Sequence, residues 1–213
     1  MFKIEYLPTG IRDKRSYDWI HLMKTYKKYA RNKHITLEIG ASNEERTLQL
    51  ARHCKKLIGV EVMPERKPKD YENIEYRLGN WETLSEIVEN NSVDVAVACH
   101  VLEHIEQDKK ALDELYKVMK KGSAAILTTP NRNRPASKTE EFFKGKKKFP
   151  WHEHFREYTE EDLVSLIEKT SFNKYKIEPV TIGITGWKLF IYFHPVPEKL
   201  RYLCGFWQVV LFK

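Results

Sequence analysis

Two histidine-rich motifs are the first candidates for chemistry in this chain. The string HVLEH places His100 and His104 around Glu103 in the H-x-x-E-H pattern of one class of zinc hydrolase, whose two histidines share a helical face. The string WHEHFREYT places His152 and His154 two residues apart, so both side chains lie on one face of an extended segment. Imidazole is well suited to acid–base catalysis near neutral pH. We therefore treat His104, His152 and His154 as candidate catalytic residues.

The position of the first motif argues against a zinc hydrolase. In that class of enzyme the pattern lies within a helix, whereas here it begins at the end of the apolar run VDVAVAC, a predicted strand. The alternative for Glu103 and His104 is a structural one, in which they satisfy the backbone at the start of a helix. The alternative for His152 and His154 is also structural, because a hydrogen-bonded histidine can tie a loop to a sheet.

A second set of residues indicates nucleoside binding. Gly40 follows the predicted strand ITLEI, and its missing side chain lets a ligand approach the backbone. Glu61 ends the next strand, at the spacing where an acidic residue accepts hydrogen bonds from ribose hydroxyls. Asn80 and Trp81 end the third strand, where an amide can pair with an adenine edge and an indole can cover the ring. A turn glycine, a surface glutamate and a turn asparagine beside a half-buried tryptophan are the alternatives.

The elements that position these residues alternate between strands and helices. Apolar runs predict seven strands, over 35–40, 56–62, 74–80, 93–99, 123–129, 174–180 and 205–212. Helices are predicted over 17–31, after a cap at Ser42 or Asn43, from the end of the fourth strand to Gly122, and after Thr159. We expect an α/β fold: a Rossmann-like doubly wound sheet of seven strands, mostly parallel with one antiparallel strand, with helices on both faces.

The domain organisation is predicted to be simple. The 213 residues suit one domain over 1–213, with an N-terminal helical cap (1–34) and two insertions on the substrate side, 131–158 and 182–203. Residues 131–150 are rich in Lys, Arg, Asn and Pro, and loops of this length are commonly functional. Residues 186–203 are aromatic and partly amphipathic, and we predict a helix there despite Pro195 and Pro197.

Composition and charge limit the class of protein. Hydrophobic residues make up 41% of the chain, which indicates a packed globule rather than disorder. No apolar run is long enough to span a bilayer, and three widely spaced cysteines fit free thiols, so we expect a cytoplasmic protein. The net charge of +7 is uneven: residues 1–34 carry nine Lys or Arg against three Asp or Glu, and residues 131–149 carry seven against two. An anionic partner and a solvated surface both explain this pattern.

The order of the motifs resembles the class I S-adenosylmethionine-dependent methyltransferases. The matching strings are Glu38-x-Gly40, Glu61, Gly79-Asn80, VDVAVACHVLEHI and YKVMKKGSAAILTTPN, within about residues 35–170. Among these enzymes the chain is most similar to the branch of small-molecule enzymes that contains the ubiquinone O-methyltransferases. The resemblance implies that S-adenosylmethionine is the cofactor. It also implies methyl transfer to an oxygen or nitrogen of a small-molecule acceptor, and the basic and aromatic segments suggest an acidic or lipid-linked one.

The resemblance implies a set of cofactor residues as well. The glycine loop lines the methionine end, Glu61 binds the ribose, the residues after the third strand meet the adenine, and those after the fourth flank the sulfonium. The residues so assigned are Glu38, Gly40, Ala41, Ser42, Glu61, Val62, Asn80, Trp81, Cys99 and His100. Ser42 and Glu44 stand where the family usually has glycines. A glutamate there would repel a pyrophosphate, which counts against a dinucleotide and not against a sulfonium cofactor.

Several alternatives stay open at this point. The charge favours a nucleic-acid (RNA) methyltransferase, but no NPPY-like or DPPY-like tetrapeptide follows the fourth strand. A non-catalytic binding protein of the same fold, or peripheral membrane contact through residues 186–212, also fits. In the ubiquinone branch, the positions of His100, Glu103 and His104 can hold a divalent metal. We assign no metal here, because hydrogen-bonding roles are common for polar residues at helix starts.

Overall fold

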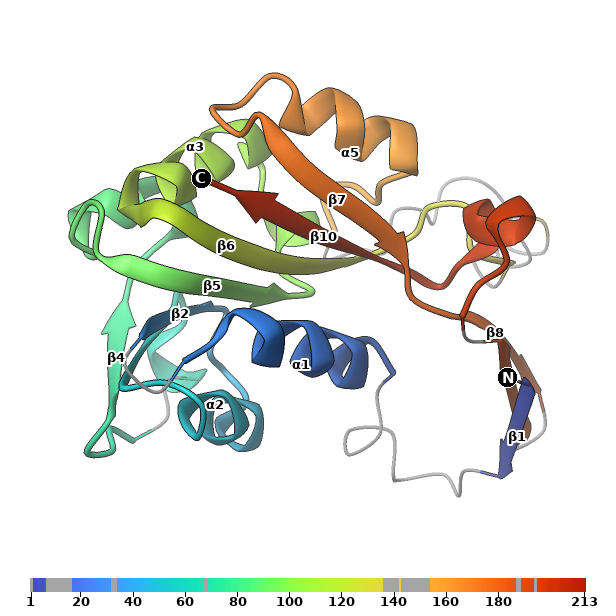
Figure 1. Ribbon diagram of the computed structural model, residues 1–213, viewed down its shortest axis with the longest axis horizontal. Coiled ribbons are helices and arrows are strands. Elements are labelled where there is room, and N and C mark those ends of the chain that lie inside the picture. Colours follow the sequence, from blue (N-terminus) through green and yellow to red (C-terminus); the bar gives the residue numbers. More distant parts are fainter. Residues whose placement is uncertain are drawn as a thin grey trace.

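The seven predicted strands form one sheet in the order β4-β3-β2-β5-β6-β10-β7 (Figure 1). The computed structural model describes residues 2–6, 17–31, 34–66, 69–135, 142, 154–186, 189–193 and 195–213. The strands are β2 (Ile35–Ile39), β3 (Lys56–Glu61), β4 (Ile74–Leu78), β5 (Val93–Cys99), β6 (Met119–Pro130), β7 (Lys174–Pro179) and β10 (Phe206–Phe212). The five strands from β4 to β6 are parallel, and β10 is antiparallel to both of its neighbours. The predicted fold class is confirmed.

Helices cover both faces of this sheet, and two separate apolar clusters mark the two interfaces (Figure 1). Helices α1 (Tyr17–Tyr29) and α2 (Glu44–Ala51) pack on one face. Helices α3 (Asp108–Val118) and α5 (Glu160–Ile167) and the 3-10 segment η2 (Trp81–Glu86) pack on the other. The predicted caps are confirmed, since Asn43 accepts from the Arg46 N–H and Thr159 forms a capping box with Asp162. Among the described residues, no helix is long and apolar enough to cross a membrane.

The strand order reverses beside β2, which lies between β3 and β5. In open α/β sheets this switch point leaves a crevice beyond the C-terminal ends of the strands, and ligands bind there. Gly40 directly follows β2, Glu61 closes β3, and His100 directly follows β5. The sheet therefore brings the two sets of candidate residues to the same edge.

The helix predicted over residues 186–203 is wrong. Strand β8 (Ile182–Gly186) and strand β9 (Leu189–Phe193) form an antiparallel hairpin, and β9 also pairs with β1 (Phe2–Tyr6) in a separate three-stranded sheet. The stretch LFIYF consists of β-branched and aromatic residues apart from its leucine, and such residues favour strands. Pro197 then precedes only a short 3-10 segment, η5 (Glu198–Leu203).

The N-terminal segment and the β5–β6 connection also differ from prediction. Residues 1–34 were expected to be a helical cap, but they contribute β1 as well as α1. The long helix expected after β5 is interrupted: η3 (Leu102–His104) precedes α3, and the chain enters β6 at Met119 instead of continuing to Gly122. Met119 is extended, with ψ 145°, because it pairs with Val93. Gly122 has φ +80° and lies within β6. One further 3-10 segment, η1 (Pro64–Arg66), follows β3.

Candidate functional site

A pocket of about 490 Å³ lies at the C-terminal ends of β2, β3 and β5. Residues of both predicted sets line it. The lining residues are Ile39, Gly40, Ser42, Val60, Glu61, Val62, Met63, Arg66, Gly79, Trp81, Cys99, His100, Val101, His104 and Ile105. The pocket thus extends from the glycine loop and Glu61 to the histidines that follow β5.

Gly40 is required by both backbone conformation and space. Its φ of +77° lies in the left-handed region, which side chains disfavour. A Cβ atom at this position would lie 2.6 Å from Cγ2 of Val101, closer than real Cβ contacts allow. The Gly40 and Ala41 N–H groups both donate to the carbonyl of Val60, which fixes the turn against β3. The loop therefore presents bare backbone to the pocket.

Glu61 is held in place by the turn that it begins. Its Oε1 accepts hydrogen bonds from the backbone N–H groups of Val62 (2.9 Å) and Met63 (3.0 Å). The side chain is buried, whereas Val62 is exposed at the rim of the pocket. Among the described residues Oε2 has no hydrogen-bond partner, so this oxygen is available to a ligand. A fixed carboxylate of this kind suits a vicinal diol.

Trp81 and Asn80 have different surroundings, although they are adjacent in sequence. Trp81 is buried and lines the pocket, and its Nε1 has no hydrogen-bond partner among the described residues. A buried donor without a partner is rare. Asn80 does not line the pocket; its Oδ1 accepts from the Glu82 N–H (3.0 Å) and so caps η2. Asn80 is therefore positioned as a helix cap rather than as a pocket wall.

Glu38 and Ala41 lie beneath the glycine loop rather than in the pocket wall. Burial raises the pKa of the Glu38 carboxyl to about 8, because removal from water disfavours the charged form more than Thr47 and Arg46 favour it. Oε2 of Glu38 has no hydrogen-bond partner among the described residues. This carboxyl supports the loop from below and is neutral over much of the physiological pH range.

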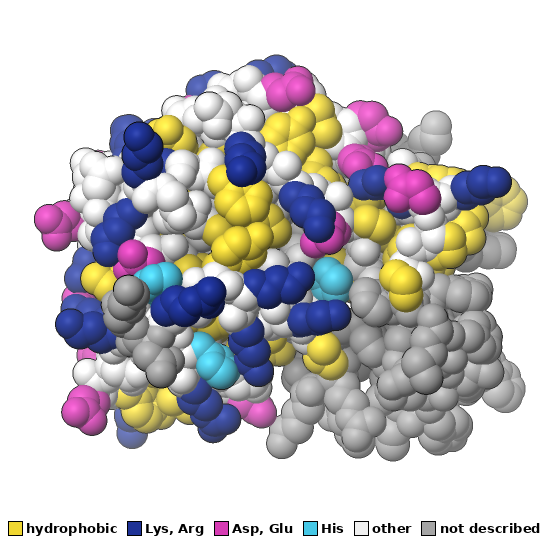
Figure 2. Space-filling model, viewed as in Figure 1, with side chains coloured by type: hydrophobic (Ala, Val, Ile, Leu, Met, Phe, Trp, Pro, Cys, Tyr) yellow, Lys and Arg dark blue, Asp and Glu magenta, His cyan; other side chains and the backbone are white. Residues whose placement is uncertain are grey.

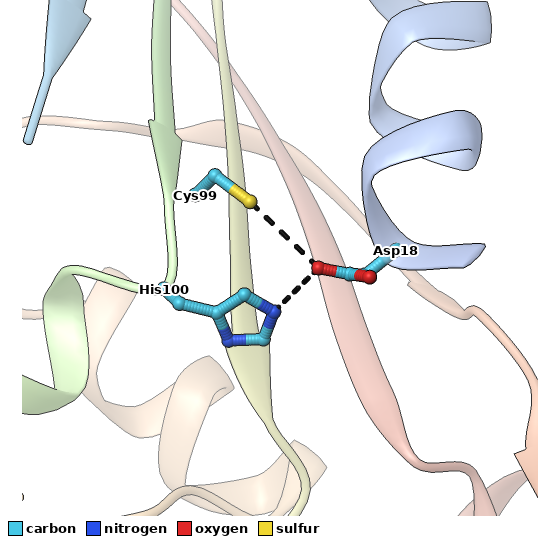
Figure 3. Close-up of side chains that lie close together, drawn as sticks. All are labelled: Asp18, Cys99 and His100. Atoms are coloured by element: carbon cyan, nitrogen blue, oxygen red, sulfur yellow. Dashed lines mark hydrogen bonds and ion pairs between the residues drawn. The ribbon is translucent and has the colours of Figure 1, made fainter. Parts of the chain in front are cut away.

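His100 is held between two carboxylates, those of Asp18 and Glu103, and Figure 3 shows its contact with Asp18. Its Nε2 lies 2.7 Å from Oδ2 of Asp18, which α1 supplies, and its Nδ1 lies 3.2 Å from Oε1 of Glu103. Burial lowers the pKa of His100, but its hydrogen bonds to Asp18 and Glu103 outweigh this and raise it to about 9. Because both ring nitrogens are occupied, His100 is an imidazolium at neutral pH and cannot serve there as a general base.

Cys99 contacts the same carboxylate. Its Sγ lies 3.8 Å from Oδ2 of Asp18 (Figure 3). The same Sγ accepts from Thr128 Oγ1 at 3.4 Å. Burial and the neighbouring Asp18 charge raise the pKa of the thiol to about 12. Cys99 is therefore a neutral thiol that packs at the end of β5, not a nucleophile.

His104 and His154 lie side by side although 50 positions separate them in sequence. Their ring centroids are 4.7 Å apart with the rings nearly perpendicular. Nδ1 of His154 lies 3.0 Å from Oε1 of Glu157, which Arg134 also contacts at 2.9 Å. Burial raises the pKa of Glu157, but His154 and Arg134 outweigh this and hold it below its usual value. His152 lies outside the described residues.

Sequence reasoning missed Asp18 and Glu157, which orient the histidines. Asp18 resembles an ordinary acidic residue in the first turn of a helix, and nothing in its local sequence indicates that α1 brings it to β5. Glu157 follows His154 by three residues, so the string HFRE carried a signal: a carboxylate within reach of an imidazole.

The comparisons with known proteins agree with this geometry. Residues 37–127 match the family model of the methyltransferase domain. The chain is structurally similar to a SAM-dependent methyltransferase from Thermotoga maritima (19% identity, TM-score 0.62, covering 91% of this chain and 88% of that chain). It is also similar to a SAM-dependent methyltransferase from Archaeoglobus fulgidus (16% identity, TM-score 0.66, covering 95% of this chain and 97% of that chain). A third similar structure is that of N-methyltransferase NodS from Bradyrhizobium japonicum in complex with S-adenosyl-l-homocysteine (16% identity, TM-score 0.61, covering 95% of this chain and 90% of that chain). No curated protein sequence matches the chain.

The fold is that of the class I, Rossmann-like methyltransferases to which the chain is structurally similar. Together with the match of residues 37–127 to the methyltransferase domain, it supports S-adenosylmethionine as the cofactor. The pocket residues fit the cofactor. Gly40 leaves backbone space that a Cβ would fill, Glu61 offers one carboxylate oxygen without a partner among the described residues, and Trp81 lines the wall.

Proposed function

We propose that this methyltransferase acts on an oxygen or nitrogen atom of a small-molecule acceptor. The observation that carries the proposal is the pocket itself, whose 490 Å³ is in the range of small-molecule sites. Glu61 and Trp81 lie toward one end and His100 and His104 toward the other. A pocket of this size favours a compact acceptor beside the cofactor.

The cofactor supplies an electrophilic methyl group on a sulfonium, and the chain supplies position. We assign the ribose hydroxyls to Glu61, because its Oε2 has no partner among the described residues, and the adenine to Trp81, because its ring lines the pocket. The Gly40 backbone accommodates the methionine portion, and Ser42 lines the same stretch of wall. Alignment of acceptor and methyl group contributes most of the rate in such a transfer.

The acceptor proton leaves on the side of the pocket that His104 lines, where His154 packs behind His104. His100 does not take it, since its two nitrogens already face Asp18 and Glu103. Instead, His100 holds the end of β5 at φ +56°, a left-handed conformation that points the following residues away from the strand. His104 lines the pocket and packs against His154, so we assign the removal of the acceptor proton to His104.

The proposal is tested with S-adenosylmethionine carrying a deuterated methyl group. The enzyme is incubated with a cell extract divided into a small-molecule filtrate and a purified RNA fraction, and both are analysed by mass spectrometry. We expect labelled O- or N-methyl products in the filtrate, and less of them with the Glu61→Ala variant at a limiting concentration of the cofactor. Label confined to the RNA fraction would overturn the small-molecule assignment, and label in neither fraction would count against both.

An RNA acceptor is the second candidate because of the charge on one face. Lys24, Lys27 and Lys28 are exposed on α1, and none has an ion-pair partner among the described residues. Figure 2 shows many Lys and Arg side chains spread over one face of the molecule. A gel shift whose affinity falls steeply with salt, and which Lys24→Glu weakens, would support this candidate.

A further inference from the structure

The first turn of α1 directs two polar side chains toward the sheet rather than toward solvent. Asp18 is 4% exposed and Trp19 is 6% exposed, whereas Ile20, which follows them, is 50% exposed. Burial of a carboxylate or of an indole N–H costs free energy unless a partner satisfies it. Neither Asp18 nor Trp19 is among the residues that line the pocket. Any effect of these two side chains on a ligand therefore passes through the residues that they contact.

Trp19 fixes α2 against α1. Its Nε1 donates to Oε1 of Gln49 at 2.9 Å, and the guanidinium carbon of Arg46 lies 5.1 Å from the centre of its ring. A cation over an indole face is attracted to it. Arg46 and Gln49 are three positions apart and so share one face of α2. Because α2 begins at Glu44, directly after the loop that Gly40 begins, these contacts limit how far the loop can move.

Asp18 fixes the end of β5 against the same turn of α1. Its Oδ2 lies 2.7 Å from Nε2 of His100 and 3.8 Å from Sγ of Cys99, as Figure 3 shows. Both His100 and Cys99 line the pocket. The first turn of α1 thus contacts the end of β5 directly and the Gly40 loop through α2.

Arg46 joins the two halves of this arrangement. Its Nη1 donates to Sγ of Cys99 at 3.6 Å, while its guanidinium group lies over the Trp19 ring. Contacts therefore run from α1 to α2, from α2 to β5, and from β5 back to α1. A site whose wall residues are fixed from behind in this way keeps its geometry without a ligand. The first-turn contacts, as we call them, are Asp18 with His100 and Cys99, Trp19 with Arg46 and Gln49, and Arg46 with Cys99.

We propose that Asp18 and Trp19 are positioning residues for the cofactor: through the first-turn contacts they hold the Gly40 loop and the end of β5 at the spacing that the cofactor requires. Gly40 and Cys99 line the pocket from the two segments that are fixed in this way. The apparent affinity of a pocket scales with the fraction of molecules in which it is competent to bind, so a pocket that is already assembled binds more tightly. The proposal rests on the proposed function only in taking S-adenosylmethionine as the ligand.

Calorimetric titration of the full-length protein with S-adenosylmethionine tests the proposal. Trp19→Leu removes the ring and the N–H together and should weaken binding about tenfold, the loss expected if one molecule in about ten keeps a competent pocket. Trp19→Phe keeps a ring beside Arg46 and should recover part of this loss. Asp18→Asn should bind the cofactor more tightly than Asp18→Ala, because its amide oxygen can still accept from Nε2 of His100.

Thr25→Val is the matched control, because it removes a buried hydrogen bond from the same helix. Oγ1 of Thr25 accepts from Nε2 of Gln208 at 2.9 Å, and neither residue lines the pocket. Gln208 keeps a second acceptor, Oε2 of Glu178, at 3.3 Å. Thr25→Val should therefore lower the melting temperature without changing the affinity for S-adenosylmethionine. If Trp19 only stabilised the fold, affinity would fall with stability in both variants.

Hydrogen exchange without ligand separates this proposal from the proposed function. In the ligand-free protein, Trp19→Leu should speed the exchange of the α2 amides, and Thr25→Val should not. If the unaltered protein does not bind S-adenosylmethionine, the proposed function fails, and the exchange comparison then decides the positioning role alone.

Two affinity results would overturn the proposal. One is unchanged affinity in Trp19→Leu, and the other is an equal loss of affinity in Trp19→Leu and Thr25→Val. Unchanged exchange of the α2 amides in Trp19→Leu would overturn it as well. Circular dichroism establishes that each variant is folded, and if Trp19→Leu does not fold, Trp19→Phe is compared with Thr25→Val in its place.

Discussion

The two ends of the pocket are built from different kinds of sequence segment. At one end, which we call the strand-end side, Gly40, Glu61 and Trp81 each close or directly follow a β-strand or begin the next turn. At the other, which we call the histidine side, His100 depends on Asp18 from α1, and His104 lies against His154 from a segment 50 positions later. The strand-end side is therefore encoded locally, whereas the histidine side exists only once distant segments have packed.

The two sides also differ in whether their buried carboxyl groups have an ion-pair partner. On the strand-end side, Glu38 has no cation in direct contact, and burial raises its pKa to about 8. On the histidine side, Asp18 and Glu157 are each paired with a cationic or imidazole group at 3.0 Å or less. A buried carboxyl without a cation or backbone N–H groups at its oxygens favours the protonated form, whereas a carboxyl that has such partners stays ionised. The predictions below test whether the histidine side depends on paired charges and the strand-end side does not.

The largest effect is expected from unpairing the histidine side. Asp18→Ala leaves His100 without its closest partner, at a site where the Asp18 side chain is 6% exposed. Breaking one half of such a pair costs about 3–5 kcal/mol, which urea unfolding would measure. Glu198→Ala is the control, because its ion pair with Arg201 is at the surface, with Glu198 80% exposed, and should contribute less than about 1 kcal/mol. Equal losses in the free energy of unfolding in the two variants would show that the buried pair of Asp18 and His100 contributes no more than a surface pair.

Glu38 gives the next effect, which depends on pH. Its pKa in the folded protein, about 8, lies above the ordinary value of 4.5, so between these pH values the folded state holds a proton that the unfolded state has lost. The free energy of unfolding therefore falls as pH rises through this window. Glu38→Gln should remove about 2–4 kcal/mol of that decline between pH 5 and pH 8. Denaturation curves at both pH values measure it, and an unchanged slope would show that Glu38 is charged.

Gly40 offers a matched comparison with Gly122. Both have φ near +80°, so substitution by alanine costs each about 1–2 kcal/mol of backbone strain. Only at Gly40 does the new Cβ meet an atom, Cγ2 of Val101 at 2.6 Å, whereas nothing lies within 4 Å at Gly122. Gly40→Ala should therefore lose about 1–3 kcal/mol more stability than Gly122→Ala. Thermal unfolding would compare them, and equal losses would mean that Val101 moves aside.

The fold could be predicted from sequence wherever a segment carries its own signal. The strands of the main sheet are apolar runs, and the Thr159 capping box is a four-residue pattern, so both were confirmed. Residues 182–193 could not be predicted in the same way, because their strands need β1 as a partner from the other end of the chain. The same physical limit applied to the site: Gly40 and Glu61 stood out by spacing, whereas Asp18 did not.

Glu61 tests the strand-end side as a cofactor site. Glu61→Ala should weaken S-adenosylmethionine binding by about 1–3 kcal/mol, the scale of hydrogen bonds to a charged group. Glu61→Gln separates the role of Glu61 in holding the turn from its role in binding the ribose. Its amide oxygen can still accept from the Val62 and Met63 N–H groups and keep the turn. Calorimetry with the cofactor measures both variants, with Glu75→Ala on the neighbouring strand as a control. Unchanged affinity in Glu61→Ala would remove the ribose assignment.

The smallest effect separates Asn80 from its neighbour Trp81. Asn80→Ala should cost about 0.5–2 kcal/mol of stability, because the Asn80 side chain caps η2. Asn80→Asp keeps an accepting oxygen at the cap and should restore most of that loss. Since Asn80 does not line the pocket, neither variant should change cofactor affinity by more than about twofold, which is well under 1 kcal/mol. A tenfold loss in Asn80→Ala would show instead that the amide reaches the adenine, and the strand-end side would then extend one residue further than its walls indicate.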